Sequence, residues 1–130
     1  MIRSAFALSM VLVALGPGLA HAQDAAAGEK VFAQCRACHQ IGPTAKNGVG
    51  PELNGLIGRK AGSVAGYTYS AANKNSGLTW DEPTFTTYIQ NPQAVVKGTK
   101  MTYAGLKDMQ KINDLIAFLK QYDEKGAKAQ

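Results

Sequence analysis

The sequence has no apolar run long enough to cross a membrane. The run from Ala5 to Leu15 falls short of the roughly 20 residues that a spanning helix needs, which disfavours a transmembrane anchor. Arg3 precedes this run, and Ala20-His21-Ala22 follows it with the small-x-small pattern of a signal-peptidase site. We therefore expect residues 1–22 to be a signal peptide and residues 23–130 to form one exported domain.

The sequence also lacks the alternating pattern of β-strands, internal repeats and low-complexity tracts. Residues 38–69 are rich in glycine and, like residues 95–106, are predicted to be loops. Loops longer than about 12–15 residues are uncommon in a compact domain unless something organises them. We therefore expect an all-α domain of three to five helices whose long ordered loops pack on a central group.

Four segments have helical features. Asp24 can cap a helix that runs to about residue 36, and residues 70–75 can form a short helical turn. Thr79-Trp80-Asp81-Glu82 matches a capping box and predicts a helix that ends before Pro92. The clearest helix covers about residues 108–122, because its apolar residues recur with helical spacing. These residues are Ile112, Leu115, Ile116 and Leu119.

Cysteine and histidine are scarce, and their arrangement is informative. The two cysteines and one of the two histidines form Cys35-Arg36-Ala37-Cys38-His39, the C-x-x-C-H motif that attaches c-type haem. Two thiols about one helical turn apart can add to the two vinyl groups of one porphyrin. His39 then lies under the ring and can ligate the iron.

Three other interpretations of this motif are weaker. A redox-active C-x-x-C normally accompanies a strand-helix pattern of thioredoxin type, which is missing here. A structural zinc site needs four ligands, whereas residues 23–130 contain only three Cys and His residues together. A plain disulfide between Cys35 and Cys38 would leave the adjacent His39 unexplained.

The few histidines and methionines of the chain limit which residue can be the second axial ligand of the iron. His39 is the only histidine in residues 23–130, so ligation by two histidines is excluded, and the available methionines are Met101 and Met109. Met101 lies in a predicted loop, whereas Met109 begins the amphipathic last helix, where core packing is expected. We favour Met101; a loop methionine that fills the core beside an open iron site is the alternative. Ligation by His and Met occupies both axial positions, which favours an electron carrier over an enzyme.

From about Gly28 to Lys120 the chain resembles mitochondrial cytochrome c and the bacterial cytochromes c2. The resemblance implies the all-α class I cytochrome c fold around one covalently bound haem c. It is carried by Cys35–His39, Gly50-Pro51, Gly58-Arg59-Lys60, Tyr67-Thr68-Tyr69, Ala72-Asn73-Lys74, Leu78-Thr79-Trp80, Asn91-Pro92, Gly98-Thr99-Lys100-Met101 and Asp114–Ala117.

The resemblance also implies roles for individual residues. Haem would be bonded to Cys35 and Cys38, with iron ligated by His39 and Met101. The Pro51 carbonyl would accept the His39 ring N–H. The other implied contacts are Tyr69, Trp80 and Arg59 at a haem propionate, Tyr88 beside the Met101 sulfur, Asn73 and Thr99 in a polar network, and Gly28 and Phe32 against the last helix.

The function implied is that of a soluble, monomeric periplasmic electron carrier. It would pass electrons from a cytochrome bc complex to a terminal oxidase or a photosynthetic reaction centre. Removal of the predicted signal peptide with Arg3 lowers the excess of basic over acidic residues from five to four. The lysines are scattered singly along the chain, so we expect acidic protein partners rather than nucleic acid. Stable membrane insertion is not expected. The implied ring of lysines at the haem edge is Lys30, Lys46, Lys97, Lys100 and Lys107.

Two other functions fit parts of the sequence. A haem protein that reacts with gases or peroxide would need a vacant or labile sixth ligand. A subunit permanently bound to one dehydrogenase could carry the same motifs.

Overall fold

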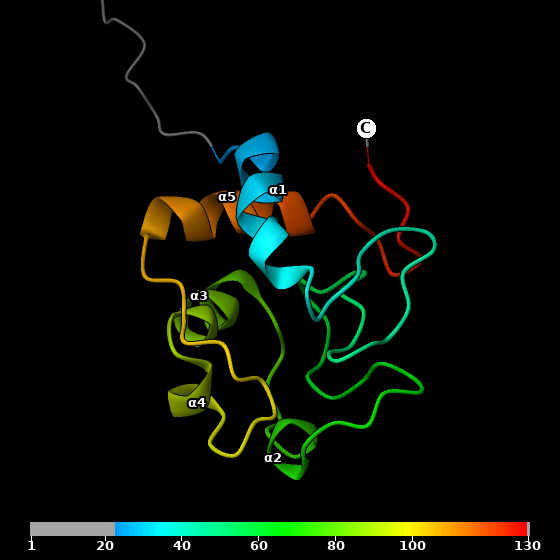
Figure 1. Ribbon diagram of the computed structural model, residues 1–130, viewed down its shortest axis with the longest axis vertical. Coiled ribbons are helices and arrows are strands. Elements are labelled where there is room, and N and C mark those ends of the chain that lie inside the picture. The colour runs from blue at the N-terminus through cyan, green and yellow to red at the C-terminus, as the bar shows by residue number, and fades with distance from the viewer. Residues whose placement is uncertain (1–22, 130) are drawn as a thin grey trace, which may run out of the picture.

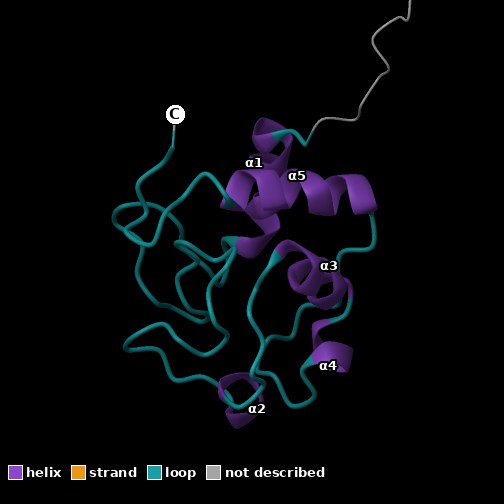
Figure 2. Cartoon of the chain, turned by 180° about the vertical axis from the view of Figure 1, so that it is seen from behind, coloured by secondary structure: helices purple, strands orange, loops and turns teal. Residues whose placement is uncertain are grey.

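The computed structural model describes residues 23–129, so the predicted signal peptide at residues 1–22 lies outside the described residues. Across the described part, helices and long loops alternate, and the β-structure consists of two isolated bridges, Lys60–Thr79 and Tyr122–Lys128 (Figure 2). The prediction of an all-α fold is confirmed. None of the described helices is long and apolar enough to span a bilayer.

Helices α1, α3, α4 and α5 lie together, α2 lies apart from them among the loops, and the long loop between α1 and α2 covers the other side of the molecule (Figure 1). Helices α1 and α5 cross at one end of the molecule, α3 lies beside them, and α4 and α2 follow toward the other end. The bounds are α1 Ala25–Phe32, followed by a 3-10 turn Ala33–Cys35, then α2 Ala71–Lys74, α3 Glu82–Gln90, α4 Pro92–Val95 and α5 Met109–Leu119.

The pairing of α1 with α5 forms the main apolar contact. The Asp24 carboxylate caps α1 by accepting the Ala26 and Ala27 N–H groups at 2.9 and 3.1 Å. A Cβ on Gly28 would lie 1.9 Å from the Asp114 carbonyl oxygen, so only glycine permits this approach. The Phe32 and Phe118 rings, with centroids 5.1 Å apart, complete the predicted contact between first and last helices.

The apolar stripe of α5 faces this contact as its spacing predicts. Its four members have at most 2% of their surface exposed, and burial of such a side chain contributes roughly 1.5–3 kcal/mol. They are Ile112, Leu115, Ile116 and Leu119. The helix ends at Leu119, three residues earlier than expected. The tail then folds back, and Gly126 lies so close to the Gly42 carbonyl that a Cβ would meet it at 2.1 Å.

The start of α3 corrects one expectation. Asp81, not Thr79, is the N-cap, and its Oδ1 accepts the Thr84 N–H at 2.8 Å. Thr79 instead forms an extended bridge with Lys60, which removes it from the helix. The capping-box interpretation is therefore wrong by two residues.

Helix α4 was not expected. The Asn91 side chain accepts the Ala94 N–H at 3.2 Å and caps a single turn that begins at Pro92. Proline is well suited to the first helical position, where its missing N–H costs nothing. Pro92 thus both ends α3, as predicted, and starts α4.

Candidate haem site

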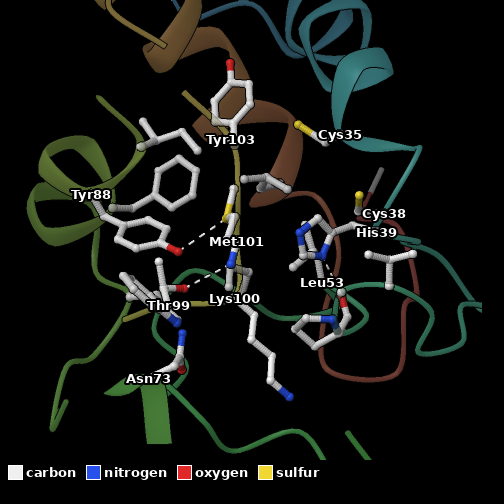
Figure 3. Close-up of a pocket in the computed structure, with 18 of the residues that line it drawn as sticks. Cys35, Cys38, His39, Leu53, Asn73, Tyr88, Thr99, Lys100, Met101 and Tyr103 are labelled. Atoms are coloured by element: carbon white, nitrogen blue, oxygen red, sulfur yellow. Dashed lines mark hydrogen bonds between the residues drawn. The ribbon is translucent and has the colours of Figure 1, made fainter. Parts of the chain in front are cut away.

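A largely apolar cavity with a volume of about 290 Å³ opens between the helices and the loops (Figure 3). Every site residue named from the sequence lines it, although these residues come from all parts of the chain. They are Cys35, Cys38, His39, Pro51, Arg59, Tyr69, Asn73, Trp80, Tyr88, Thr99 and Met101.

Met101 and Met109 lie in different surroundings. Met101 lines the cavity, whereas Met109 lies outside it and has 48% of its surface exposed. The expectation that Met109 packs in the core is therefore wrong. Met109 is the first residue of α5, where a side chain has fewer neighbours than in mid-helix.

His39 is oriented by its neighbours on the following loop. Its Nδ1 donates to the Pro51 carbonyl at 2.7 Å, which leaves Nε2 as the nitrogen that can ligate a metal. A Cβ on Gly50 would lie 2.4 Å from Cε1 of the ring, so this glycine allows the loop to lie against the imidazole. Burial lowers the pKa of His39, opposed by the Pro51 bond, and favours the neutral ring that binds metals.

The two cysteines lie where α1 unwinds. Neither forms a disulfide; Cys35 is half-buried and Cys38 is exposed. Burial, followed by the neighbouring Cys38, raises the pKa of the Cys35 thiol to about 11. Redox-active cysteines have lowered pKa values instead, so this environment disfavours a thiol-disulfide oxidoreductase.

Met101 is held by a set of polar contacts. The Tyr88 hydroxyl donates to its sulfur at 3.2 Å, and its own N–H donates to Thr99 Oγ1 at 3.3 Å. The Gln93 side-chain amide donates to the Met101 carbonyl at 2.7 Å. Burial raises the pKa of Tyr88, partly offset by Thr99, so Tyr88 keeps its proton and remains a donor. Gln93 was missed from the sequence, because none of the motifs that carry the resemblance includes it.

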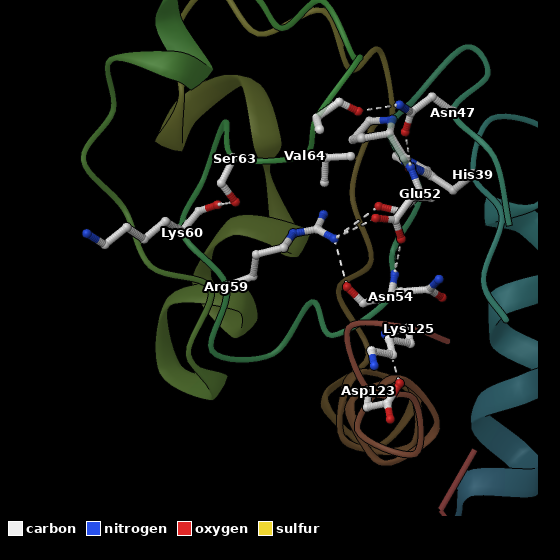
Figure 4. A network of polar contacts seen from close by, with 12 residues as sticks. His39, Asn47, Glu52, Asn54, Arg59, Lys60, Ser63, Val64, Asp123 and Lys125 are labelled. Atoms are coloured by element: carbon white, nitrogen blue, oxygen red, sulfur yellow. Dashed lines mark hydrogen bonds and ion pairs between the residues drawn. The ribbon is translucent and has the colours of Figure 1, made fainter. Parts of the chain in front are cut away.

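Arg59 lies in a polar network at the edge of the cavity (Figure 4). Its Nη1 donates to the carbonyls of Glu52 and Asn54 at 3.1 and 2.9 Å and lies 3.7 Å from the Glu52 carboxylate. Burial lowers the pKa of Arg59, while Tyr69 and Glu52 oppose this shift. Glu52 was missed from the sequence, since no motif includes it.

Two buried polar atoms of the described residues have no hydrogen-bond partner, Nε of Arg59 and Oδ1 of Asn73. The Tyr69 hydroxyl accepts the Val64 N–H at 3.0 Å, which leaves its hydrogen available to another acceptor. Unpaired buried polar atoms are costly, so they indicate a missing partner. An apolar cavity with a nitrogen and a thioether donor and a cationic edge fits an iron porphyrin that carries acidic side groups.

Comparisons with known proteins agree with this geometry. The family model "Cytochrome c" matches residues 25–123. The chain is 55% identical over 123 residues to cytochrome c2 of Blastochloris viridis, with 95% of each chain covered. It is 59% identical over 102 residues to cytochrome c-550 of Bradyrhizobium diazoefficiens, with 78% of this chain and 75% of that one covered.

Solved structures show the same similarity. Cytochrome cH from Methylobacterium extorquens has a TM-score of 0.71 at 51% identity and covers 75% of this chain and 97% of its own. Cytochrome c2 from Rhodospirillum centenum has a TM-score of 0.73 at 39% identity, with 77% and 98% covered.

The fold and the cavity together define a small haem electron carrier of the class I type, not an enzyme. Such proteins hold haem c covalently. The chain belongs to the cytochrome c family, in the group of the cytochromes c2.

Proposed function

We propose that this chain is a periplasmic single-haem electron carrier of the cytochrome c2 type. Haem c is bonded to Cys35 and Cys38, and its iron is ligated by His39 and Met101. The observation that carries this proposal is that His39 and Met101 lie on opposite sides of one cavity, with both cysteines at its rim (Figure 3). The bound haem supplies an iron that gains and loses one electron.

The protein residues hold both axial ligands in place. The Pro51 carbonyl fixes the His39 ring, and the Tyr88 hydroxyl fixes the Met101 sulfur. With His39 and Met101 both on the iron, the site would leave no position for a substrate, which favours one-electron transfer over catalysis. Tyr69, Trp80 and Arg59, which line the cavity, would bind a propionate, and Asn73 and Thr99 would share a polar network on the Met101 side.

The proposed location and partners depend on features beyond the cavity. The predicted signal peptide supports the periplasm, between a cytochrome bc complex and a terminal oxidase or photosynthetic reaction centre. The five lysines of the predicted ring are all exposed, which supports docking to acidic partners. Two of them also bind main-chain carbonyls, since Lys100 donates to Thr68 at 2.8 Å and Lys107 donates to Gln90.

Replacement of the axial methionine tests the ligand assignment. Met101→Ala should abolish the thioether-to-iron charge-transfer band of the ferric protein, lower the reduction potential and open the iron to cyanide. Met109→Leu should change none of these, because Met109 is exposed and lies outside the cavity. A high-spin ferric spectrum in the unaltered protein would support the gas- or peroxide-reactive alternative. Elution of the native protein only as a complex with a dehydrogenase would support the subunit alternative.

Charge reversal tests the docking face. Electron transfer to an acidic partner should slow as salt rises, because the Debye length falls from about 30 Å at 0.01 M to about 10 Å at 0.1 M. Lys30→Glu or Lys97→Glu should slow it further and flatten the salt dependence. Lys125→Glu or Lys128→Glu alters the net charge equally but should matter much less. Equal losses from both pairs would rule out a local lysine ring.

A further inference from the structure

Tyr103 forms a bond across the edge of the cavity that no motif anticipates. It follows Met101 by two residues, and both it and Cys35 line the cavity (Figure 3). Its hydroxyl donates to Oε1 of Gln34 at 3.0 Å. Gln34 lies in the 3-10 turn Ala33–Cys35, next to the first attachment cysteine. The bond therefore joins the loop of the proposed iron ligand to the segment that attaches the haem.

The other contacts of this loop lie on different sides. Gln93 holds the Met101 carbonyl from α4, and Lys100 holds the loop against the Thr68 carbonyl. After Met101, the loop returns to the end of α3, where the Leu106 N–H donates to the Ile89 carbonyl at 2.8 Å. Tyr103 lies between these points, and its bond to Gln34 joins the loop to the 3-10 turn that follows α1.

We propose that Tyr103 and Gln34 form a clasp that positions Met101 on the iron. The proposal rests on the assignment of Met101 as axial ligand. For an external ligand to replace Met101, the loop must move away from the 3-10 turn, and this movement breaks the clasp. A neutral hydrogen bond of ordinary net strength then lowers the population of the open loop by roughly two- to tenfold.

The contribution of the hydroxyl can be separated from that of the ring. The Tyr103 ring packs against the apolar core, and Tyr103→Phe keeps this packing while it removes the donor. Gln34→Met keeps the length of the side chain but removes the acceptor, and Gln34→Glu retains an acceptor oxygen. Tyr67→Phe is the matched control, because the Tyr67 hydroxyl also donates at this cavity, but to the Val49 carbonyl at 2.8 Å and not to a residue next to a haem-attachment cysteine.

The test is the rate at which imidazole binds to the ferric holoprotein. Imidazole is a suitable probe because it binds as a neutral molecule. The negative charge introduced by Gln34→Glu should therefore have little direct effect on its binding rate. We expect Tyr103→Phe and Gln34→Met each to raise the rate roughly two- to tenfold. The double variant should be no faster than either single variant, since both remove the same bond. Gln34→Glu and Tyr67→Phe should stay close to the unaltered protein.

An unchanged rate in Tyr103→Phe would overturn the clasp, and so would an equal increase in Tyr67→Phe. Absence of the thioether band in the unaltered ferric protein would instead overturn the ligation by Met101. In that case, hydrogen exchange of the Met101 and Leu106 amides still tests whether the bond between Tyr103 and Gln34 holds the loop. This measurement does not depend on the identity of the iron ligand. Exchange should be faster in Tyr103→Phe than in Tyr67→Phe, and equal exchange would contradict the clasp.

Discussion

The helix pair α1–α5 and the loop-lined cavity differ in what completes them. In the helix pair, Phe32 and Phe118 are fully buried, and the buried Asp114 carboxylate accepts the Asp24 N–H and the Gln110 amide. At the cavity, Arg59 and Asn73 each have a buried polar atom without a partner among the described residues. Protein atoms alone satisfy the first region, whereas the second needs a large cofactor to fill it.

The largest expected effect comes from preventing haem attachment. Cys35→Ala combined with Cys38→Ala should give a chain from which haem is extracted by acid acetone. A domain typically has a free energy of unfolding of about 5–15 kcal/mol, and this variant should lose most of it. Hydrogen exchange should show residues 38–70 unprotected, with any residual protection confined to α1 and α5. Full protection of the loop without haem would contradict the contrast between the two regions.

The next effect tests the helix pair alone. Gly28→Ala should lower the free energy of unfolding in urea by about 3 kcal/mol, since its Cβ would meet the Asp114 carbonyl at 1.9 Å. Gly48→Ala is the control from the loop region, where the nearest atom to a Cβ, the Cys38 carbonyl oxygen, lies at 3.8 Å. Similar losses from both changes would show that the helix contact is looser than the structure indicates.

A smaller effect is expected from the polar contact inside the helix pair. Asp114→Ala should cost about 1–3 kcal/mol of unfolding free energy, because the partly buried hydrogen bond from the Asp24 N–H loses its acceptor. Asp114→Asn keeps an acceptor oxygen and should cost less. Urea unfolding of the two variants provides the comparison, and an equal cost would assign the effect to charge instead of the hydrogen bond.

The smallest effect is a pH dependence at the start of α3. The Thr84 contacts lower the pKa of the Asp81 carboxyl, so its contribution to stability is present above the pKa of the unfolded chain and is lost as the pH falls through the lowered value. Asp81→Asn can still cap the helix but cannot titrate. Unfolding measured from neutral to acidic pH should show a slightly shallower decline in this variant, and parallel curves would exclude a contribution from Asp81.

The sequence predicts the helices of the α1–α5 pair better than it predicts the contacts between the loops that line the cavity. Periodic apolar residues such as Ile112 and Leu115 identified α5, and Asp24 identified the start of α1, because these signals are local. The cap at Asp81 was misplaced because Thr79 is drawn into a bridge with Lys60, a contact that no local pattern encodes.

The cavity residues were named from motifs and resemblance, and the structure brings them all together. What the sequence could not reveal are the contacts between loops distant along the chain. Glu52 beside Arg59, Gln93 on the Met101 carbonyl and Tyr103 on Gln34 depend on how loops meet in space. Met109 was misjudged because helical spacing alone does not show where a helix extends past its neighbours.

The pairing of α1 with α5 also affects the order in which the chain can fold. The hydrogen bond from Asp24 to Asp114 spans 90 residues, and Phe32 meets Phe118 only after nearly the whole chain exists. Contacts so distant along the chain must overcome a large loop-closure entropy before they stabilise anything. The first helix therefore has no partner until α5 is present, and the core can assemble only when both ends of the domain can meet.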